Sequence, residues 1–113
     1  MSRERLPDRR QSKTFKIPRF AGLRASYHIT AGNYPDDRIG EVFISTNRGG
    51  SAMEALARDV AILMSLCLQF GCSISTIRDA LTRESNGEPS TIAGAAADAI
   101  AKWENGDRHE QTR

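Results

Sequence analysis

The clearest candidate for chemistry is a glycine-rich turn in which Arg48, Gly49, Gly50 and Ser51 lead into a helix-forming stretch. Such a turn exposes backbone N–H groups beside the positive end of the helix dipole, where anions bind. Arg48 could add a charge-assisted hydrogen bond to a phosphate. The spacing and the Lys-Ser/Thr ending of a Walker motif are both missing, so a simple strand-to-helix connection is the alternative. These four residues form the candidate nucleotide- or phosphate-binding site.

Acidic residues suggest metal or acid–base chemistry at two further places. Asp36 and Asp37 lie in a turn close in sequence to Glu41, although turn aspartates more often hydrogen-bond their own backbone. Asp59 lies in a mostly apolar helix, where its carboxylate should need a partner such as an arginine or a backbone N–H. His28 lies in a predicted strand and belongs to no visible triad. Because no nucleophile, base and oxyanion-binding group come together, we expect no catalytic residues, metal site or bound cofactor.

The two cysteines, Cys67 and Cys72, form neither a redox pair nor a zinc site. They do not have CxxC spacing, and no cluster of cysteine and histidine completes a metal site. Cys67 lies inside an apolar helix, where cysteine usually acts as a small hydrophobic residue. Free thiols in a reducing compartment are therefore expected. With no visible signal peptide and no apolar run of the ~20 residues that span a membrane, the prediction is a cytoplasmic protein without a membrane partner.

Positive charge is concentrated at the start of the chain. The formal net charge is only +2, yet residues 1–20 contain seven basic and two acidic residues. Pro7, Pro18 and the lack of sustained periodicity predict a flexible basic arm over this range. Such an arm suits an anionic partner, which could be a nucleic acid, a nucleotide or an acidic protein surface, and a solvated tail is the alternative.

The rest of the sequence predicts an α+β domain over residues 21–104 and a polar tail over residues 105–113. Residue types that favour strands occur at 24–30 and 41–46 and flank a turn-rich segment, which is typical of an antiparallel hairpin. Because two strands alone are marginal in water, this hairpin or small sheet must pack on helices. At 113 residues, the chain fits a single domain.

Three helices are expected after the second strand. Residues 52–70 carry apolar side chains around most of the circumference, which predicts a central helix that is buried on most sides and ends at Gly71. A second helix is expected to begin at Ser73, and a third at Ser90 or Thr91. The exposed hairpin edge and the alanine-rich third helix could support a homo-oligomer, by edge pairing or close helix packing.

Several spaced blocks of the sequence resemble the TSCPD domain family. They are Gly40-Glu41-Val42-Phe43-Ile44, Gly49-Gly50-Ser51, Ala57-Arg58-Asp59-Val60-Ala61 and Ser65-Leu66-Cys67-Leu68-Gln69-Phe70-Gly71. The resemblance covers residues 20–101, although the Thr-Ser-Cys-Pro-Asp string that names the domain does not occur in this sequence. The family includes the C-terminal domain of ribonucleotide reductases, especially the vitamin B12-dependent class, and small stand-alone proteins.

The resemblance implies a link to deoxyribonucleotide synthesis, and so to DNA replication, without the catalytic step. The radical-bearing barrel and the active-site and redox cysteines of a full reductase are not in this sequence, and cobalamin is implied only for the full-length enzymes. The predicted role is an accessory module that binds a nucleotide or the catalytic chain of a ribonucleotide reductase. The alternatives are a stand-alone oligomeric protein that binds or sequesters a nucleotide, and a nucleic-acid binder that acts through the basic arm.

Overall fold

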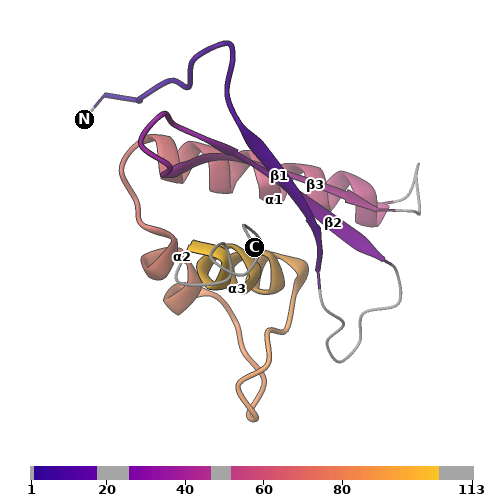
Figure 1. The fold of residues 1–113 in the computed structure, drawn as a ribbon. Coiled ribbons are helices and arrows are strands. Elements are labelled where there is room, and N and C mark those ends of the chain that lie inside the picture. Colours follow the sequence, from indigo (N-terminus) through magenta and orange to yellow (C-terminus); the bar gives the residue numbers. More distant parts are fainter. Residues whose placement is uncertain (1, 18–25, 47–51, 105–113) are drawn as a thin grey trace, which may run out of the picture.

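A computed structural model describes residues 2–17, 26–46 and 52–104 of the chain. Within these residues a three-stranded antiparallel sheet precedes three helices, which confirms the predicted α+β class (Figure 1). The predicted tail, residues 105–113, lies outside the described part. The elements in chain order are β1 (Ser12–Lys16), β2 (Tyr27–Asn33), β3 (Ile39–Thr46), α1 (Ala52–Gln69), α2 (Ile74–Ala80) and α3 (Ile92–Lys102).

The sheet has β2 at its centre, with β1 and β3 on either side. Antiparallel pairing sets Ile29 opposite Ile44 and Thr30 opposite Phe43. Because side chains alternate between the two faces of a strand, one face of the sheet carries the apolar residues and the other is mostly polar. The apolar face is buried and contains Tyr27, Ile29, Ala31, Val42 and Ile44.

The first strand lies inside the segment that the sequence predicts to be a flexible arm. Ser12–Lys16 pairs with β2 along its whole length, and the N–H of Ile17 continues the pairing to the Tyr27 carbonyl at 2.9 Å. Phe15 is half-buried and Ile17 is buried, so alternate side chains of this segment reach the core. Residues 12–17 therefore belong to the folded sheet, although two of these six residues are lysines.

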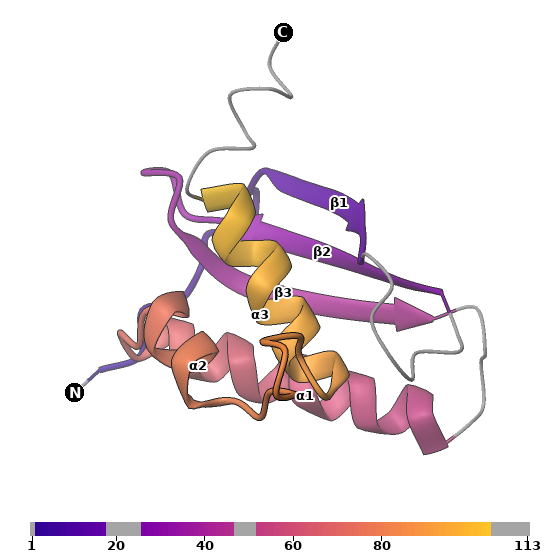
Figure 2. The ribbon, with the colours of Figure 1, turned by 90° about the horizontal axis from the view of Figure 1, so that it is seen from below.

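The helices cover the apolar face and one edge of the sheet. Figure 2 shows α3 crossing in front of the strands, while α1 runs alongside β3. Ile92 and Ile100 of α3 join the strand residues in one buried cluster, and α1 contributes Met64 together with two alanines, Ala57 and Ala61. The sheet and the helices therefore form two layers that share a single core.

The ends of the helices follow the signals expected from the sequence. α1 ends before Gly71, whose φ of +99° lies in the left-handed region that glycine adopts without strain. Ser73 begins α2, because its hydroxyl accepts a hydrogen bond from the Thr76 N–H at 3.1 Å. Of the two expected starts of α3, the structure selects Thr91, whose hydroxyl accepts from the Gly94 N–H at 3.4 Å.

The alanine-rich surface of α3 packs inside the domain. Ala96 and Ala97 are buried, and a Cβ added at Gly94 would lie 3.0 Å from the Cβ of Pro89. The small residues therefore let the chain's own segments approach the helix. This covered face offers little surface for the predicted self-association through α3, and the homo-oligomer stays a prediction.

Candidate functional site

The helix α1 and the residue after it carry a row of mostly exposed apolar side chains, which we call the outer stripe. Leu56 and Leu63, near its middle, are 54% and 63% exposed. Successive members are three or four residues apart, so they share one face of the helix over ~25 Å. This is the spacing of the contact seam between two packed helices. The stripe consists of the exposed residues Met53, Leu56, Leu63, Cys67 and Phe70 and of Val60, which is half-buried and also packs against the core.

The prediction of a central helix that is buried on most sides is therefore wrong. The buried residues of α1 are Ala57, Ala61, Met64 and Gln69, which face β3 and the core. Asp59 is exposed, so its carboxylate needs no partner to offset burial. The larger apolar residues face solvent because the helix lies close to the strand, where alanine fits.

Two polar side chains of α1 bind the backbone of β3 along its outer edge. The Gln69 amide donates from Nε2 to the Gly40 carbonyl at 2.8 Å. The Ser65 hydroxyl accepts from the Val42 N–H at 2.8 Å and lies 3.1 Å from the Val42 carbonyl oxygen. These bonds satisfy backbone groups that a further strand would otherwise pair. Part of the sheet edge is thus closed by side chains from a helix.

A groove of about 500 Å³ lies beside this edge, between β3 and α1. Phe43, on the polar face of the sheet, forms one wall, and Ile62 and Leu66 of α1 form the other. Two arginines also line it, Arg3 and Arg58. The Arg3 side chain donates to the Gln69 side-chain oxygen. The groove lies on a neighbouring face of α1, since Ile62 directly precedes Leu63 and is turned about 100° from it around the helix.

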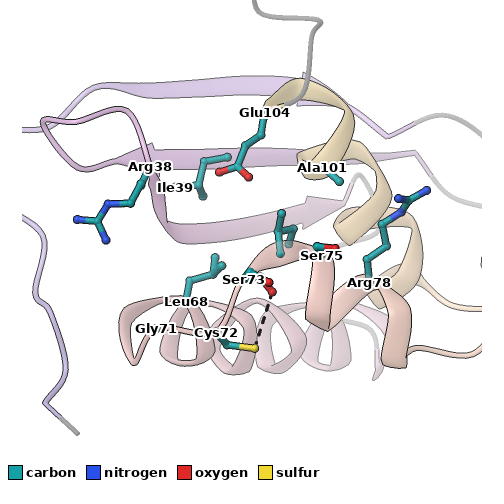
Figure 3. A pocket seen from close by; sticks show the side chains of 11 residues that line it. Arg38, Ile39, Leu68, Gly71, Cys72, Ser73, Ser75, Arg78, Ala101 and Glu104 are labelled. Carbon is teal, nitrogen blue, oxygen red and sulfur yellow. Dashed lines mark hydrogen bonds between the residues drawn. The ribbon is translucent and has the colours of Figure 1, made fainter.

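A second hollow, of about 380 Å³, lies between the β2–β3 turn, α2 and the end of α3 (Figure 3). Arg38 and Arg78 lie at its two ends, with Cys72, Ser73 and Glu104 between them. Two arginines and hydroxyls would suit an anion in principle. Each of the arginines, however, already contacts carboxylates of the chain.

The arginines near this hollow favour the charged forms of Asp36 and Asp98. Arg38 donates to Asp36 at 2.7 Å and contacts Glu4 at 2.9 Å, and its hydrogen bond keeps the pKa of Asp36 below the ordinary value. The pKa of Asp98 is also lowered, first by a hydrogen bond from Arg83 and then by one from Arg78, against the opposing effect of burial. An anion in the hollow would have to compete with these partners, so it is a weak candidate site.

The acidic residues singled out in the sequence do not converge. Asp36 accepts from the backbone N–H of Arg38 at 3.2 Å, as expected of a turn aspartate. Glu41 lies on the sheet, where Arg10 donates to both of its oxygens at 2.7 and 2.9 Å. Among the described residues, no group of three or more histidine, cysteine, aspartate and glutamate side chains could hold a metal ion.

The candidate phosphate-binding residues Arg48, Gly49, Gly50 and Ser51 lie outside the described residues, so this site stays a prediction. Cys67 is exposed on the outer stripe and not enclosed as a core residue, and Cys72 is half-buried. Both thiols are free in the structure. No helix in the described part of the chain is long and apolar enough to cross a membrane.

Comparison with known proteins identifies a family and several relatives of this sequence. The model of the TSCPD domain family matches residues 2–103. The vitamin B12-dependent ribonucleotide reductase of Rhodopirellula baltica is 34% identical over 108 residues, which cover 89% of this chain and 10% of that protein. The reductases of Bradyrhizobium diazoefficiens and Agrobacterium fabrum are 38% and 39% identical over 80 residues, which cover 71% of this chain and 6% of each protein. The chain thus spans a tenth or less of the length of these relatives, and no solved structure matches significantly.

Proposed function

Because this chain belongs to the TSCPD domain family, we propose that it is an accessory module of the ribonucleotide reductase system that docks on a reductase catalytic chain. The relatives contain a similar segment as a small part of a much longer protein. A segment of this kind can act by binding, and the described residues of this chain expose an apolar contact surface. We expect this role to serve deoxyribonucleotide synthesis in the cytoplasm, with reduction performed by the reductase.

The observation that carries this proposal is the outer stripe of α1. Large contiguous apolar patches on a folded domain mark interaction sites, whereas isolated apolar residues do not. Fully burying a leucine contributes ~1.5–3 kcal/mol, and Leu56 and Leu63 each retain more than half of their exposed surface in the domain. Their burial in a complex would therefore contribute substantially to affinity, and the helical spacing suits a partner helix.

Nucleotide binding is the second part of the predicted role. It rests on Arg48, Gly49, Gly50 and Ser51, which directly precede the first residue of α1. The hollow in Figure 3 gives it little support, because Arg38 and Arg78 are engaged by carboxylates. We therefore favour protein docking over nucleotide binding as the main role.

Binding of the intact chain to the vitamin B12-dependent reductase of Agrobacterium fabrum tests the proposal, with biolayer interferometry as the measurement. That reductase should be used both intact and without its matching segment, which could occupy the same surface. Leu63→Asp should weaken binding at least tenfold, because it places a charge in the centre of the contact. Ile62→Asp is the matched control, since it makes the same kind of change on the face of α1 that lines the groove, outside the outer stripe, and should leave binding to the reductase unchanged.

Two results would contradict the proposal. One is no binding of the wild-type chain to either form of the reductase at micromolar concentration. The other is equal loss of binding in both variants, with circular dichroism showing that both are folded. If light scattering instead shows a dimer that Leu63→Asp converts to a monomer, the outer stripe serves a second copy, and the stand-alone oligomer is the better reading.

A further inference from the structure

The edge of β3 that faces α1 is only partly closed. Val42 directs its N–H and C=O away from β2 and toward Ser65. In an antiparallel pair the direction of these groups alternates along a strand, so Ile44 directs its own N–H and C=O to the same side. The strand therefore offers a second backbone donor and acceptor along this edge.

Among the described residues, the side chains that close the edge end before Ile44. A step of four residues along α1 covers about 6 Å, close to the roughly 6.6 Å of two residues along a strand. Gln69 and Ser65, four residues apart, therefore contact Gly40 and Val42, two residues apart. The next step on α1 is Ala61, which has no polar side-chain atom to bind Ile44. Side chains of α1 thus replace the hydrogen bonds of a further strand at Gly40 and Val42, whereas at Ile44 the helix contributes only the apolar Ala61 to the groove lining.

The groove beside α1 opens at this part of the edge. Ile44 lines it, and its two walls carry Phe43 and Ile62, which are 54% and 50% exposed. Backbone groups next to apolar walls are the combination that binds extended peptides, because the backbone provides affinity and the walls select side chains. A volume of about 500 Å³ lies within the usual range of ligand sites and holds a few residues of such a peptide.

The charge of the groove favours an acidic occupant. Arg58, on its rim, has a side chain that is 69% exposed and whose contact with Glu54 is a long one of 3.7 Å. Arg3 lines the groove as well. The acidic residue of the lining, Glu41, is neutralised by the two hydrogen bonds from Arg10. A carboxylate on the occupant would therefore meet a guanidinium at the rim that is mostly exposed and whose ion pair with Glu54 is long.

We propose that this groove binds an extended acidic peptide segment of a partner protein, which pairs with the backbone of β3 at Ile44. An apolar side chain of the peptide lies between Phe43 and Ile62, and a carboxylate contacts Arg58. The site is separate from the outer stripe, so it does not depend on docking to a reductase. The domain would then bind short extended peptides at the groove, in addition to packing against a partner helix through the outer stripe.

The test begins with selection of binders from a library of random octapeptides against the intact chain. The selected peptides are expected to combine a β-branched or aromatic residue with an acidic residue two or three positions away. NMR titration of the ¹⁵N-labelled chain with the best peptide should shift the amide signals of Phe43, Ile44 and Ile62. Methylation of one backbone nitrogen of the peptide, at the position that pairs with Ile44, should weaken binding at least tenfold because it removes the N–H.

Variants of the chain separate this site from the rest of the surface. Phe43→Ser and Arg58→Ala should each weaken the peptide at least fivefold, whereas Leu63→Asp on the outer stripe should leave its affinity unchanged. The proposal is overturned if no octapeptide binds more tightly than millimolar, if every singly N-methylated peptide binds as well as the parent, or if the shifts map to the outer stripe. Concentration-dependent shifts at Ile44 without peptide would assign the groove to a second copy and would also overturn it.

Discussion

Replacing Ser65 with alanine should destabilise the domain, even though alanine is the better helix former. The Ser65 hydroxyl lies 2.8 Å from the Val42 nitrogen and 2.8 Å from the Ala61 carbonyl oxygen. It has one proton, so it accepts from Val42 and donates to a single carbonyl at a time. The side chain therefore joins α1 to the edge of β3, and alanine would break that connection without changing the backbone of the helix.

The expected size of the effect follows from what the Val42 N–H loses. A net hydrogen bond contributes ~0.5–1.5 kcal/mol, and a buried donor left without a partner costs ~1–3 kcal/mol. Alanine recovers up to ~0.5 kcal/mol through its helix propensity. Because Ser65 is half-buried, water can replace part of the lost bond, so we expect a net loss of ~1–2 kcal/mol. For a domain of this size that lowers Tm by about 5–10 °C.

Urea unfolding followed by circular dichroism measures this loss directly. Ser75→Ala is the matched control, because Ser75 is an exposed helical serine in α2 and its replacement should be neutral or slightly stabilising. If the hydroxyl closes the strand edge, the free energy of unfolding should be lower for Ser65→Ala than for Ser75→Ala. If Ser65→Ala is as stable as the wild type, the hydroxyl does not close the strand edge. The argument that Ile44 is the first open position along β3 would then lose its basis.

Two further perturbations test the packing and the charges. Gly40→Ala should cost ~2–4 kcal/mol, because the new Cβ would lie 2.3 Å from the Tyr34 ring, and thermal unfolding should show a smaller added loss when Tyr34→Ala is already present. Asp98→Asn should lower the free energy of unfolding at pH 7 by ~1–3 kcal/mol, since Arg83 and Arg78 both bind the carboxylate. The lowered pKa of Asp98 means that its contribution is present above an unfolded pKa of ~3.9 and is lost as the pH falls toward the folded value. A wild-type-to-variant difference that stays constant from pH 7 to pH 2.5 would contradict this assignment.

The features that the sequence predicted correctly are set by a few neighbouring residues. Gly71 specifies the end of α1, and the Ser73 hydroxyl specifies the start of α2. Neither signal depends on distant contacts. The strands predicted at 24–30 and 41–46 from their residue types overlap β2 and β3, which extend further into the turn-rich segment between them. The class of fold and the order of its elements follow from such local signals.

The strand β1 could not be predicted in the same way. Only Phe15 and Ile17 are apolar between Ser12 and Ile17, and lysines at 13 and 16 make the stretch look like part of a charged arm. The segment is ordered by hydrogen bonds to β2, a partner more than ten residues away. A pairing partner that distant leaves no periodic signal in the strand itself.

The orientation of α1 was misjudged for a related reason. Helical periodicity identifies residues that share a face but does not say which face contacts the core. Reading the larger residues as buried places Leu56 and Leu63 inside, whereas the structure buries Ala57 and Ala61. The information that decides between them is the distance from the helix to β3, which no local pattern records.

That distance also links the two candidate surfaces to one cause. Serine has a short side chain, so Ser65 can bind the backbone of Val42 only if α1 lies almost against β3, and such an approach requires alanines on the contact face. The larger apolar residues of α1 are then left on its other faces, where they form the outer stripe and one wall of the groove. A substitution such as Ala61→Leu should push the helix away from the strand and disturb both surfaces together. The exposed apolar surface of this domain is thus a consequence of how the helix closes the sheet edge, and a partner that covers it stabilises an arrangement the fold already imposes.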